Sequence, residues 1–388
     1  MSRVRTGLTF LLAVGCARPT PSPTPAGWTS VRRLLDSAIT AGAAPGAVLG
    51  VSVRGRHYYY YGTGRLGLDD PTRPDSETRY DLASVTKVVS LTTLAMIAVD
   101  SGLLDLDAPV VRYLPGFAPR PADPEREGVT IRHLLTHSSG LPAWRPLYQE
   151  AATREAAFAL ADTTALLAPP GTTFLYSDLG AIVLTQVIEQ LFRHRIDTLF
   201  AERIAQPLDL TETRYLPPAT WLPEIAPTEN DPWRGRVLRG EVHDENAARL
   251  DGVSGNAGLF SSARDLLRFG DWLAEQVDGQ TPRHPAGLRV AHAGVFVERQ
   301  DIPPGSSRAL GWDTPSGVSS GGSHLGPRGF GHTGFTGTSI WIDPDRALVI
   351  VLLSNRVHPT RQNNRWGAVR GLVADRVVAA FFPEGASH

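Results

Sequence analysis

A serine and a lysine three positions apart are the first side chains of this sequence whose types and spacing suggest chemistry. Lys87 is the only lysine among 388 residues, and arginine supplies every other strongly basic side chain. A buried lysine ammonium can lose its proton and then act as a base, whereas an arginine guanidinium stays charged. Ser84 precedes Lys87 by three residues, which on a helix places the two Cβ atoms about 5 to 6 Å apart on one face. The pair predicts a nucleophilic serine with an amine as its base.

The residues after Ser84 predict a buried helix that runs to about Ser101. Between Ser84 and Asp100, Lys87 is the only charged residue, and most of its neighbours are valine, leucine, isoleucine or methionine. Burial disfavours an ammonium, so we expect the pKa of Lys87 to lie below its usual value. The free backbone N–H groups at the start of the helix could stabilise an oxyanion at Ser84. The structural alternative is a buried lysine that extends its ammonium to solvent or pairs with a carboxylate.

Two later segments carry polar side chains that complete a pattern. Tyr176 lies in Leu-Tyr-Ser-Asp-Leu directly before a predicted helix, and His332 begins His-Thr-Gly in a predicted edge strand. In this order, Ser-x-x-Lys, the tyrosine motif and His-Thr-Gly resemble the serine β-lactamase and penicillin-binding protein superfamily. Tyrosine in the second motif is similar to the class C β-lactamase-like branch of β-lactamase-related serine hydrolases. Further stretches that look like this family are 134–142, 256–262 and 334–338, and the resemblance runs from about residue 30 to 382.

The resemblance implies an acyl-enzyme reaction that needs no metal or organic cofactor. Ser84 would attack a carbonyl carbon, and Lys87 and Tyr176 would share the proton transfers. The backbone N–H groups of Ser84 and Phe335 would form the oxyanion hole. A tyrosine has a usual pKa near 10, so Tyr176 needs a nearby cation to act as a base, and Lys87 is the candidate. The residues that the resemblance assigns to substrate or oxyanion binding are His332, Thr333, Gly334, Phe335 and Asp178.

Two positions depart from the family pattern. Asp178 stands where members usually carry asparagine, and an ionised carboxylate can only accept hydrogen bonds. It could pair with Lys87 and raise the lysine pKa, or cap the helix that starts at Leu179. His332 stands where lysine is usual, and a neutral imidazole attracts a substrate carboxylate less than an ammonium does.

Both departures favour a serine hydrolase of esters, amides or D-amino-acid peptides that does not require a substrate carboxylate. One alternative is a β-lactamase or DD-carboxypeptidase proper. An alternative of another class is a non-catalytic protein that binds peptidoglycan or β-lactams.

The order of helical and strand patterns predicts one sheet assembled from both ends of the chain, with the middle inserted. The resemblance implies one catalytic domain over residues 28–388, with the α/β (α+β) β-lactamase and transpeptidase-like fold. An antiparallel sheet is expected from about 28–85 and 305–388, flanked by helices, with a helical subdomain inserted between. Helices are expected from Ser30 to about Thr40, over 262–274 and over 363–381, strands over 47–53, 57–61, 337–342 and 347–353, and an exposed Gly/Ser-rich loop over 314–328.

Residues 1–27 have the composition of an export signal followed by a tether. Arg3 and Arg5 precede an apolar run, and Ala-Val-Gly-Cys then resembles a lipobox in which Cys16 would be acylated. The residues that follow are rich in proline and cannot bury a core. We expect an exported protein, periplasmic or anchored to the membrane as a lipoprotein.

Composition limits the partners. The formal net charge of −1 gives no electrostatic reason to expect nucleic acid, and membrane contact is expected only through the lipid anchor. A single cysteine excludes a disulfide within one chain. The expected partner is a small-molecule or cell-wall peptide substrate, and the oligomeric state stays open.

Other motifs are weaker. Gly-x-Ser-x-Gly at 317–321 matches a nucleophile elbow, but it lacks the strand and helix that an elbow needs around it. His133 and His137 could face one metal ion, but no third ligand stands out. His243, Asp244 and Asn246 are expected to fix a loop, with a place on the rim of a cleft as the alternative.

Overall fold

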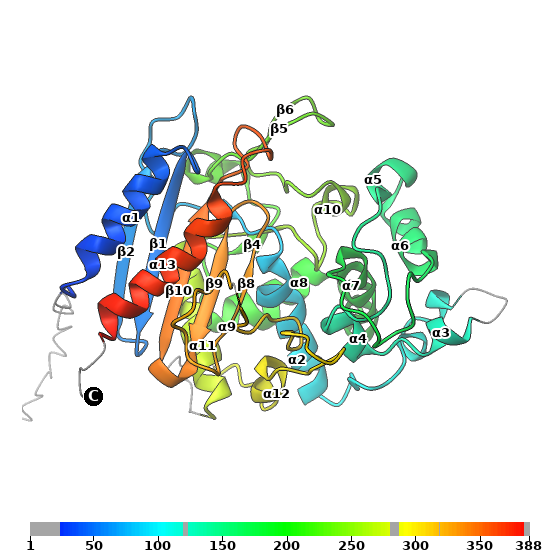
Figure 1. Ribbon diagram of the computed structural model, residues 1–388. Helices are drawn as coiled ribbons and strands as arrows, with labels where there is room; N and C mark the ends of the chain where they lie inside the picture. Colours follow the sequence, from blue (N-terminus) through cyan, green and yellow to red (C-terminus); the bar gives the residue numbers. More distant parts are fainter. Residues whose placement is uncertain (1–23, 119–122, 280–286, 318, 384–388) are drawn as a thin grey trace, which may run out of the picture.

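The main sheet is built from segments near both ends of the chain. The computed structural model describes residues 24–118, 123–279, 287–317 and 319–383. Five antiparallel strands lie in the order β2, β1, β10, β9, β8 (Figure 1). Their bounds are Gly46–Val53 for β1, His57–Gly64 for β2, Phe330–Thr333 for β8, Ser339–Asp343 for β9 and Leu348–Ser354 for β10. Strand β1 pairs directly with β10, so the early and late parts of the chain meet in one sheet.

Helices cover both faces of this sheet. α1 (Trp28–Thr40) and α13 (Trp366–Phe381) cross one face side by side, and α11 (Ala263–Val277) covers the other (Figure 1). Because both faces are buried, β1 and β10 are apolar along almost their whole length. α11 comes close because Gly270 has no side chain: a Cβ there would lie 2.5 Å from a methyl carbon of Val349.

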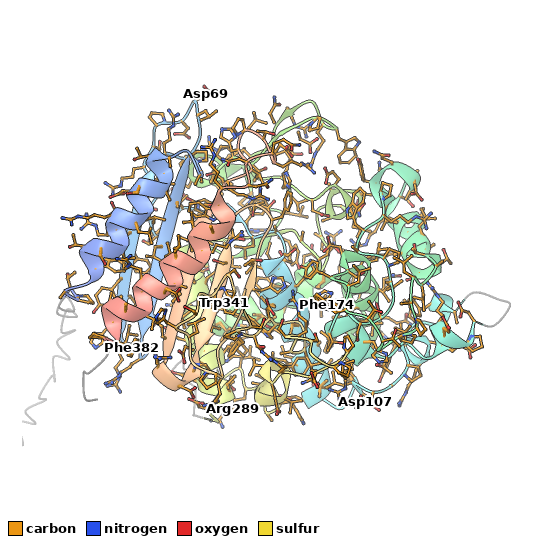
Figure 2. All side chains as sticks on the ribbon, viewed as in Figure 1. Asp69, Asp107, Phe174, Arg289, Trp341 and Phe382 are labelled. Atoms are coloured by element: carbon orange, nitrogen blue, oxygen red, sulfur yellow. The ribbon has the colours of Figure 1, made fainter. Side chains whose placement is uncertain are left out.

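The middle of the chain forms a helical region beside the sheet. α7 (Asp178–Phe192) packs against several of its neighbours, and side chains fill the space between the helical region and the sheet (Figure 2). The other α-helices are α2 (Thr93–Asp100), α3 (Pro124–Glu127), α4 (Ile131–Leu135), α5 (Leu147–Glu150), α6 (Arg154–Thr163), α8 (Ile196–Phe200), α9 (Gln206–Leu208), α10 (Glu245–Arg249) and α12 (Ala293–Val297). Short strands form two small sheets: β3 (Tyr80–Asp81), β7 (Leu259–Ser261) and β4 (Arg214–Tyr215) in one, β5 (Asn230–Asp231) and β6 (Arg236–Val237) in the other.

The helix predicted from Ser84 to Ser101 is not a uniform α-helix. Residues Lys87–Thr92 form a wider, π-helical segment, and α2 follows it. The hydroxyl of Thr93 donates to the carbonyl oxygen of Val88, five residues back. Such widened turns are frequent at functional sites, and no glycine or proline within the segment announces this one.

The predicted antiparallel sheet with flanking helices is confirmed, and its strands lie close to the predicted bounds. The Gly/Ser-rich stretch at 314–328 is not simply an exposed loop, because Gly321 packs against Trp341 and Gly322 against Asp375. Within the described ranges, no helix is long and apolar enough to cross a membrane. Cys16 and most of the predicted export segment lie outside the described residues.

Candidate active site

Ser84 lies in a tight turn, residues 81–84, which we call the nucleophile turn. Ala83 has a φ of 45°, in the left-handed region that residues with a Cβ rarely adopt. Its N–H donates to one Asp81 carboxylate oxygen at 2.8 Å, and the other oxygen accepts the N–H of His243 at 2.6 Å. Asp81 therefore fixes the turn that presents Ser84, a role that the sequence did not reveal.

Lys87 is buried, and its side-chain nitrogen is surrounded by oxygen atoms. Nζ lies 3.0 Å from Ser84 Oγ, 2.9 Å from the carbonyl oxygen of Asn256 and 2.6 Å from Asp178 Oδ1. Burial pulls the pKa of Lys87 down, but the Asp178 carboxylate and Tyr176 outweigh burial and hold it above its usual value. The prediction that burial lowers the pKa of Lys87 is therefore wrong, because the Asp178 carboxylate keeps the ammonium charged.

Asp178 is the first residue of α7, but it does not cap that helix. Ser177 is the N-cap, and its Oγ accepts the N–H of Gly180 at 3.1 Å. Asp178 therefore pairs with Lys87 and does not act as a helix cap.

Tyr176 lies among two imidazoles and two cations. The centroid of its ring is 4.4 Å from that of His137 and 5.9 Å from that of His332. Lys87 Nζ and the guanidinium carbon of Arg308 lie 5.1 and 5.3 Å from the same centroid. The Tyr176 hydroxyl is buried and makes no hydrogen bond with any described residue. Both cations stabilise negative charge that develops on the phenol oxygen during a proton transfer.

His332, on the edge strand β8, is neutral. Burial, with the charges of Arg308 and Lys87, holds its pKa well below its usual value. A carbonyl can only accept, so Nδ1–H donates to the Thr333 carbonyl oxygen at 2.8 Å and Nε2 carries the lone pair. Nε2 is buried and has no partner in the described part of the chain. The third motif thus offers a hydrogen-bond acceptor and not a positive charge.

The loop after β8 is tied to the nucleophile turn. The hydroxyls of Thr336 and Thr338 donate to the carbonyl oxygens of Asp81 and Leu82, at 2.7 and 2.8 Å. Gly334 approaches so closely that a Cβ there would lie 2.3 Å from the Leu82 oxygen. These contacts bring the loop alongside the nucleophilic serine.

Two arginines hold the two peptide groups on either side of Phe335. Arg370 Nη2 donates to the Gly334 carbonyl oxygen at 2.6 Å, and Arg356 Nε donates to that of Phe335 at 2.8 Å. A trans peptide is planar with C=O and N–H opposed, so fixing the Gly334 carbonyl also fixes the Phe335 N–H. The backbone N–H groups of Phe335 and Ser84 make no hydrogen bond within the described part of the chain. Both are therefore open to an oxyanion.

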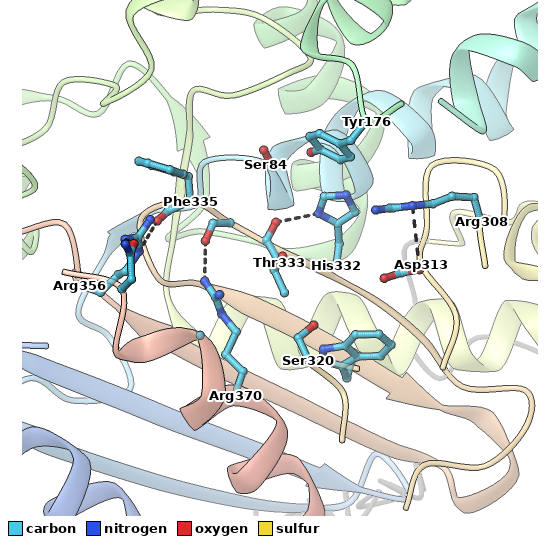
Figure 3. A pocket seen from close by; sticks show the side chains of 14 residues that line it. Ser84, Tyr176, Arg308, Asp313, Ser320, His332, Thr333, Phe335, Arg356 and Arg370 are labelled. Atoms are coloured by element: carbon cyan, nitrogen blue, oxygen red, sulfur yellow. Dashed lines mark hydrogen bonds and ion pairs between the residues drawn. The ribbon is translucent and has the colours of Figure 1, made fainter. Parts of the chain in front are cut away.

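A cleft with two lobes opens over Ser84. The lobes have volumes of about 450 and 330 Å³ and share Ser84, Tyr176 and Phe335. The larger one, which we call the arginine lobe, includes Arg308, Asp313, His332, Thr333, Arg356 and Arg370 (Figure 3). The smaller one, which we call the acidic lobe, includes Trp144, Asp178, Asp244, Glu245, Asn256 and Arg361. The nucleophile thus lies where lobes of opposite charge meet.

The sequence motifs include the residues at this junction but not the arginines. Arg308, Arg356 and Arg370 belong to none of the three motifs, and no local pattern marks them among the many arginines of the chain. Asp244, considered as a rim residue, does line the cleft. Asn246 is buried and fixes a loop, since its Oδ1 accepts the N–H of Tyr148 at 3.1 Å.

The competing motifs have other roles in the structure. His133 Nδ1 accepts the N–H of Thr130 in a helix cap, and His137 Nδ1 accepts that of Ser177. No group of three His, Cys, Asp or Glu side chains within the described ranges could hold a metal ion. The described residues around Gly317 and Gly321 form neither the strand nor the helix of a nucleophile elbow, and Val318 lies outside them.

The chain is similar to known proteins over most of its length. The family model described as Beta-lactamase matches residues 31–374. An N-acetylmuramyl-L-alanine amidase of Bacillus subtilis (strain 168) is 31% identical over 361 residues, covering 84% of this chain and 80% of the relative. A putative D-alanyl-D-alanine carboxypeptidase of Escherichia coli (strain K12) is 30% identical over 357 residues, covering 82% and 80%.

Solved structures share the fold. EstCE1, a hydrolase with promiscuous acyltransferase activity, has a TM-score of 0.72 at 24% identity, covering 90% of this chain and 98% of that one. A class C beta-lactamase mutant has a TM-score of 0.72 at 20% identity, covering 91% and 97%. Fold, site and relatives together define a serine hydrolase that acts through an acyl-enzyme. The chain belongs to the Beta-lactamase family, and the predicted resemblance is confirmed.

Proposed function

We propose that the protein removes the C-terminal residue from cell-wall peptides that end in a D-amino acid, through an acyl-enzyme at Ser84. The observation that carries the proposal is the arginine lobe beside Ser84. Arg308 Nε and Nη1 and Arg370 Nε are buried and make no hydrogen bond with a described residue. Asp313 lies 3.9 Å from Arg308 Nε, too far for a hydrogen bond. Open guanidinium donors suit a carboxylate, so this lobe would bind the C-terminus of the peptide.

The arginines favour a substrate with a carboxylate, whereas His332 alone favoured one without it. A neutral His332 favoured substrates without a required carboxylate, but Arg308 and Arg370 supply positive charge from elsewhere in the chain. Burial and the charge of Arg356 lower the pKa of Arg370 to about 10, so it remains a cation at neutral pH. The names of two relatives, a putative D-alanyl-D-alanine carboxypeptidase and an N-acetylmuramyl-L-alanine amidase, support a cell-wall peptide.

The reaction would proceed in two steps. Ser84 Oγ attacks the scissile carbonyl carbon, and the N–H groups of Ser84 and Phe335 hold the oxyanion. Tyr176 accepts the serine proton and gives its own proton to the leaving nitrogen, so the C–N bond breaks and the terminal amino acid departs. Water then attacks the Ser84 ester by the same proton relay, and the shortened peptide leaves as an acid.

Lys87 has an electrostatic role in this scheme. Its ammonium donates to Ser84 Oγ from 3.0 Å and stabilises the negative charge that forms as the serine loses its proton. Asp178 keeps that ammonium charged. This differs from the role of base that its spacing from Ser84 first suggested.

A matched pair of peptides tests the proposal. The probes are diacetyl-L-Lys-D-Ala-D-Ala and the same peptide with a C-terminal amide. We expect a kcat/KM at least about tenfold higher for the free acid, as one charge-assisted contact would give, and no turnover by Ser84→Ala. Equal rates for acid and amide, or far faster turnover of p-nitrophenyl esters or cephalosporins, would refute it. A fluorescent penicillin that labels Ser84 and never leaves would instead favour the non-catalytic binder.

We further propose that the protein is exported and anchored through an acylated Cys16. The support is the sequence of residues 1–27, with two early arginines, an apolar run and the lipobox-like stretch. Radiolabelled palmitate should enter the wild type and not Cys16→Ala, and the variant should move from the membrane to the soluble periplasmic fraction. Equal labelling and identical fractionation of both proteins would contradict the anchor.

A further inference from the structure

We propose that the acidic lobe binds an ammonium group on the acyl part of the substrate. The direction rests on the proposed function: a C-terminal carboxylate in the arginine lobe puts the acyl part beyond Ser84, in the acidic lobe. Three hydrogen-bond acceptors of the lobe, on Asp178, Asp244 and Asn256, carry the inference.

Two carboxylates of the lobe keep an open oxygen. Asp178 uses Oδ1 for Lys87, and its Oδ2 has no partner among the described residues. Asp244 Oδ1 accepts the N–H of Ala247 at 2.7 Å and the amide Nδ2 of Asn256 at 3.1 Å. Its Oδ2 likewise has no partner in the described part of the chain. Each carboxylate can therefore accept a donor from a ligand.

Asn256 adds a third acceptor of a different kind. Its side chain is buried, with 1% of the residue exposed, and it lines the same lobe. Because its Nδ2 donates to Asp244, its Oδ1 is the acceptor end, and this oxygen has no described partner. A buried amide oxygen without a donor costs free energy unless a ligand supplies one. An ammonium has three N–H donors and no acceptor, which matches three open acceptors.

The charge around Asp244 also favours a cation. Burial and the neighbouring Asp178 carboxylate raise the pKa of Asp244 to about 6, so it is mostly ionised at neutral pH. A bound cation would relieve the repulsion between these two carboxylates.

The cations already present do not neutralise the lobe. Lys87 balances Asp178. Arg361 is shared between Glu245 at 2.7 Å and Glu229 at 2.5 Å, and Glu229 also contacts His243 at 2.9 Å. The charge of Asp244 therefore remains unbalanced. A metal ion fits less well, since no described group of three His, Cys, Asp or Glu side chains could hold one.

Ampicillin and benzylpenicillin form a matched pair of probes, because they differ in one ammonium group on the acyl side chain. The measurement is the second-order rate constant for acylation of Ser84 at pH 7.5. We expect about a tenfold advantage for ampicillin in the wild type, the effect of one charge-assisted hydrogen bond. In Asp244→Asn the ratio should fall to about one, and asparagine should preserve the fold because it also caps helices such as α10.

Glu241→Gln is the matched control variant. Glu241 pairs with Arg236 in an exposed position, so the substitution removes one negative charge outside the cleft. It should keep the ampicillin advantage. A wild-type ratio near one, or the same ratio in wild type and Asp244→Asn, would overturn the inference.

Different assays test the proposed carboxypeptidase function and the proposed ammonium site. If diacetyl-L-Lys-D-Ala-D-Ala is not hydrolysed, the proposed function fails, while the ratio of the two penicillins still reports on the acidic lobe. If the peptide acid is hydrolysed and both penicillins react alike, the ammonium inference alone is wrong.

Discussion

The ion pair between Lys87 and Asp178 can be tested by Asp178→Asn, which removes the charge and keeps the shape of the side chain. The Oδ1 atom lies 2.6 Å from Lys87 Nζ, and the carboxylate is one reason that the lysine pKa lies above its usual value. Removing one partner of a buried ion pair costs about 3 to 5 kcal/mol. The Asp178 side chain is 21% exposed and an amide oxygen still accepts from Lys87, so the cost is reduced. We expect the free energy of unfolding to fall by about 2 kcal/mol.

The raised pKa of Lys87 also predicts how its contribution to stability changes with pH. A group whose folded pKa is raised contributes stability that is fully present below its unfolded pKa, near 10.4 for lysine. That contribution is lost as the pH rises through the folded value. The wild type should therefore keep the contribution of Lys87 throughout the neutral range and lose it only in strong base. Urea unfolding of both proteins between pH 6 and pH 9 measures the difference, and a loss below about 0.5 kcal/mol would refute the ion pair.

The same variant has a kinetic signature. Without the carboxylate, burial dominates and the pKa of Lys87 should fall below its usual value. A neutral lysine could then accept the proton of Ser84 directly. Acylation by Asp178→Asn should rise with pH across the neutral range, whereas wild-type acylation should show no such limb from Lys87. Identical pH profiles would contradict this reasoning.

Three further substitutions test other parts of the site. Lys87→Arg should fold but lose acylation by at least about a thousandfold, because a longer, planar guanidinium cannot reproduce the three contacts of Nζ. Arg370→Met should lower kcat for an uncharged p-nitrophenyl ester about tenfold, because Arg370 holds the Gly334 carbonyl and thereby the Phe335 N–H. Ala83→Gly should raise the free energy of unfolding by about 0.5 to 1 kcal/mol. The strain of a left-handed alanine, about 1 to 2 kcal/mol, exceeds the free energy that glycine loses through the larger entropy of the unfolded chain, about 0.4 to 1 kcal/mol.

Each of these has a clear contrary result. An active Lys87→Arg enzyme in a p-nitrophenyl ester assay would show that any cation serves at this position. If Arg370→Met raises only the KM for carboxylate substrates and leaves kcat for the ester unchanged, Arg370 binds substrate without orienting the oxyanion hole. A lower melting temperature for Ala83→Gly would show that the turn is not strained.

Local sequence patterns predicted much of the fold. Apolar runs located β1 and β10, and helical periodicity located α1 and α11, because these elements are buried on faces that set their residue pattern. The widened turn at Lys87–Thr92 had no such signal. The composition of the Gly/Ser-rich stretch predicts exposure, because its contacts with Trp341 and α13 depend on the assembled sheet and leave no local signal.

The site was predictable only where its residues lie in recognisable motifs. Ser84, Lys87 and Tyr176 were identified by type and spacing, and the structure brings them together. The sequence does not determine the pKa of Lys87, because it allows Asp178 either to cap a helix or to pair with the amine, and only the tertiary structure shows the contact with Nζ. Arg308 and Arg370 could not be found at all, since their approach to Ser84 is a property of the tertiary structure.

The most direct test of the account is the identity of the acylated residue. The protein is mixed with benzylpenicillin, quenched in acid, digested and examined by tandem mass spectrometry. We expect one penicilloyl adduct, located on Ser84, which disappears with time as water releases it and never forms in Ser84→Ala. An adduct on another residue, or hydrolysis that persists in Ser84→Ala, would contradict it.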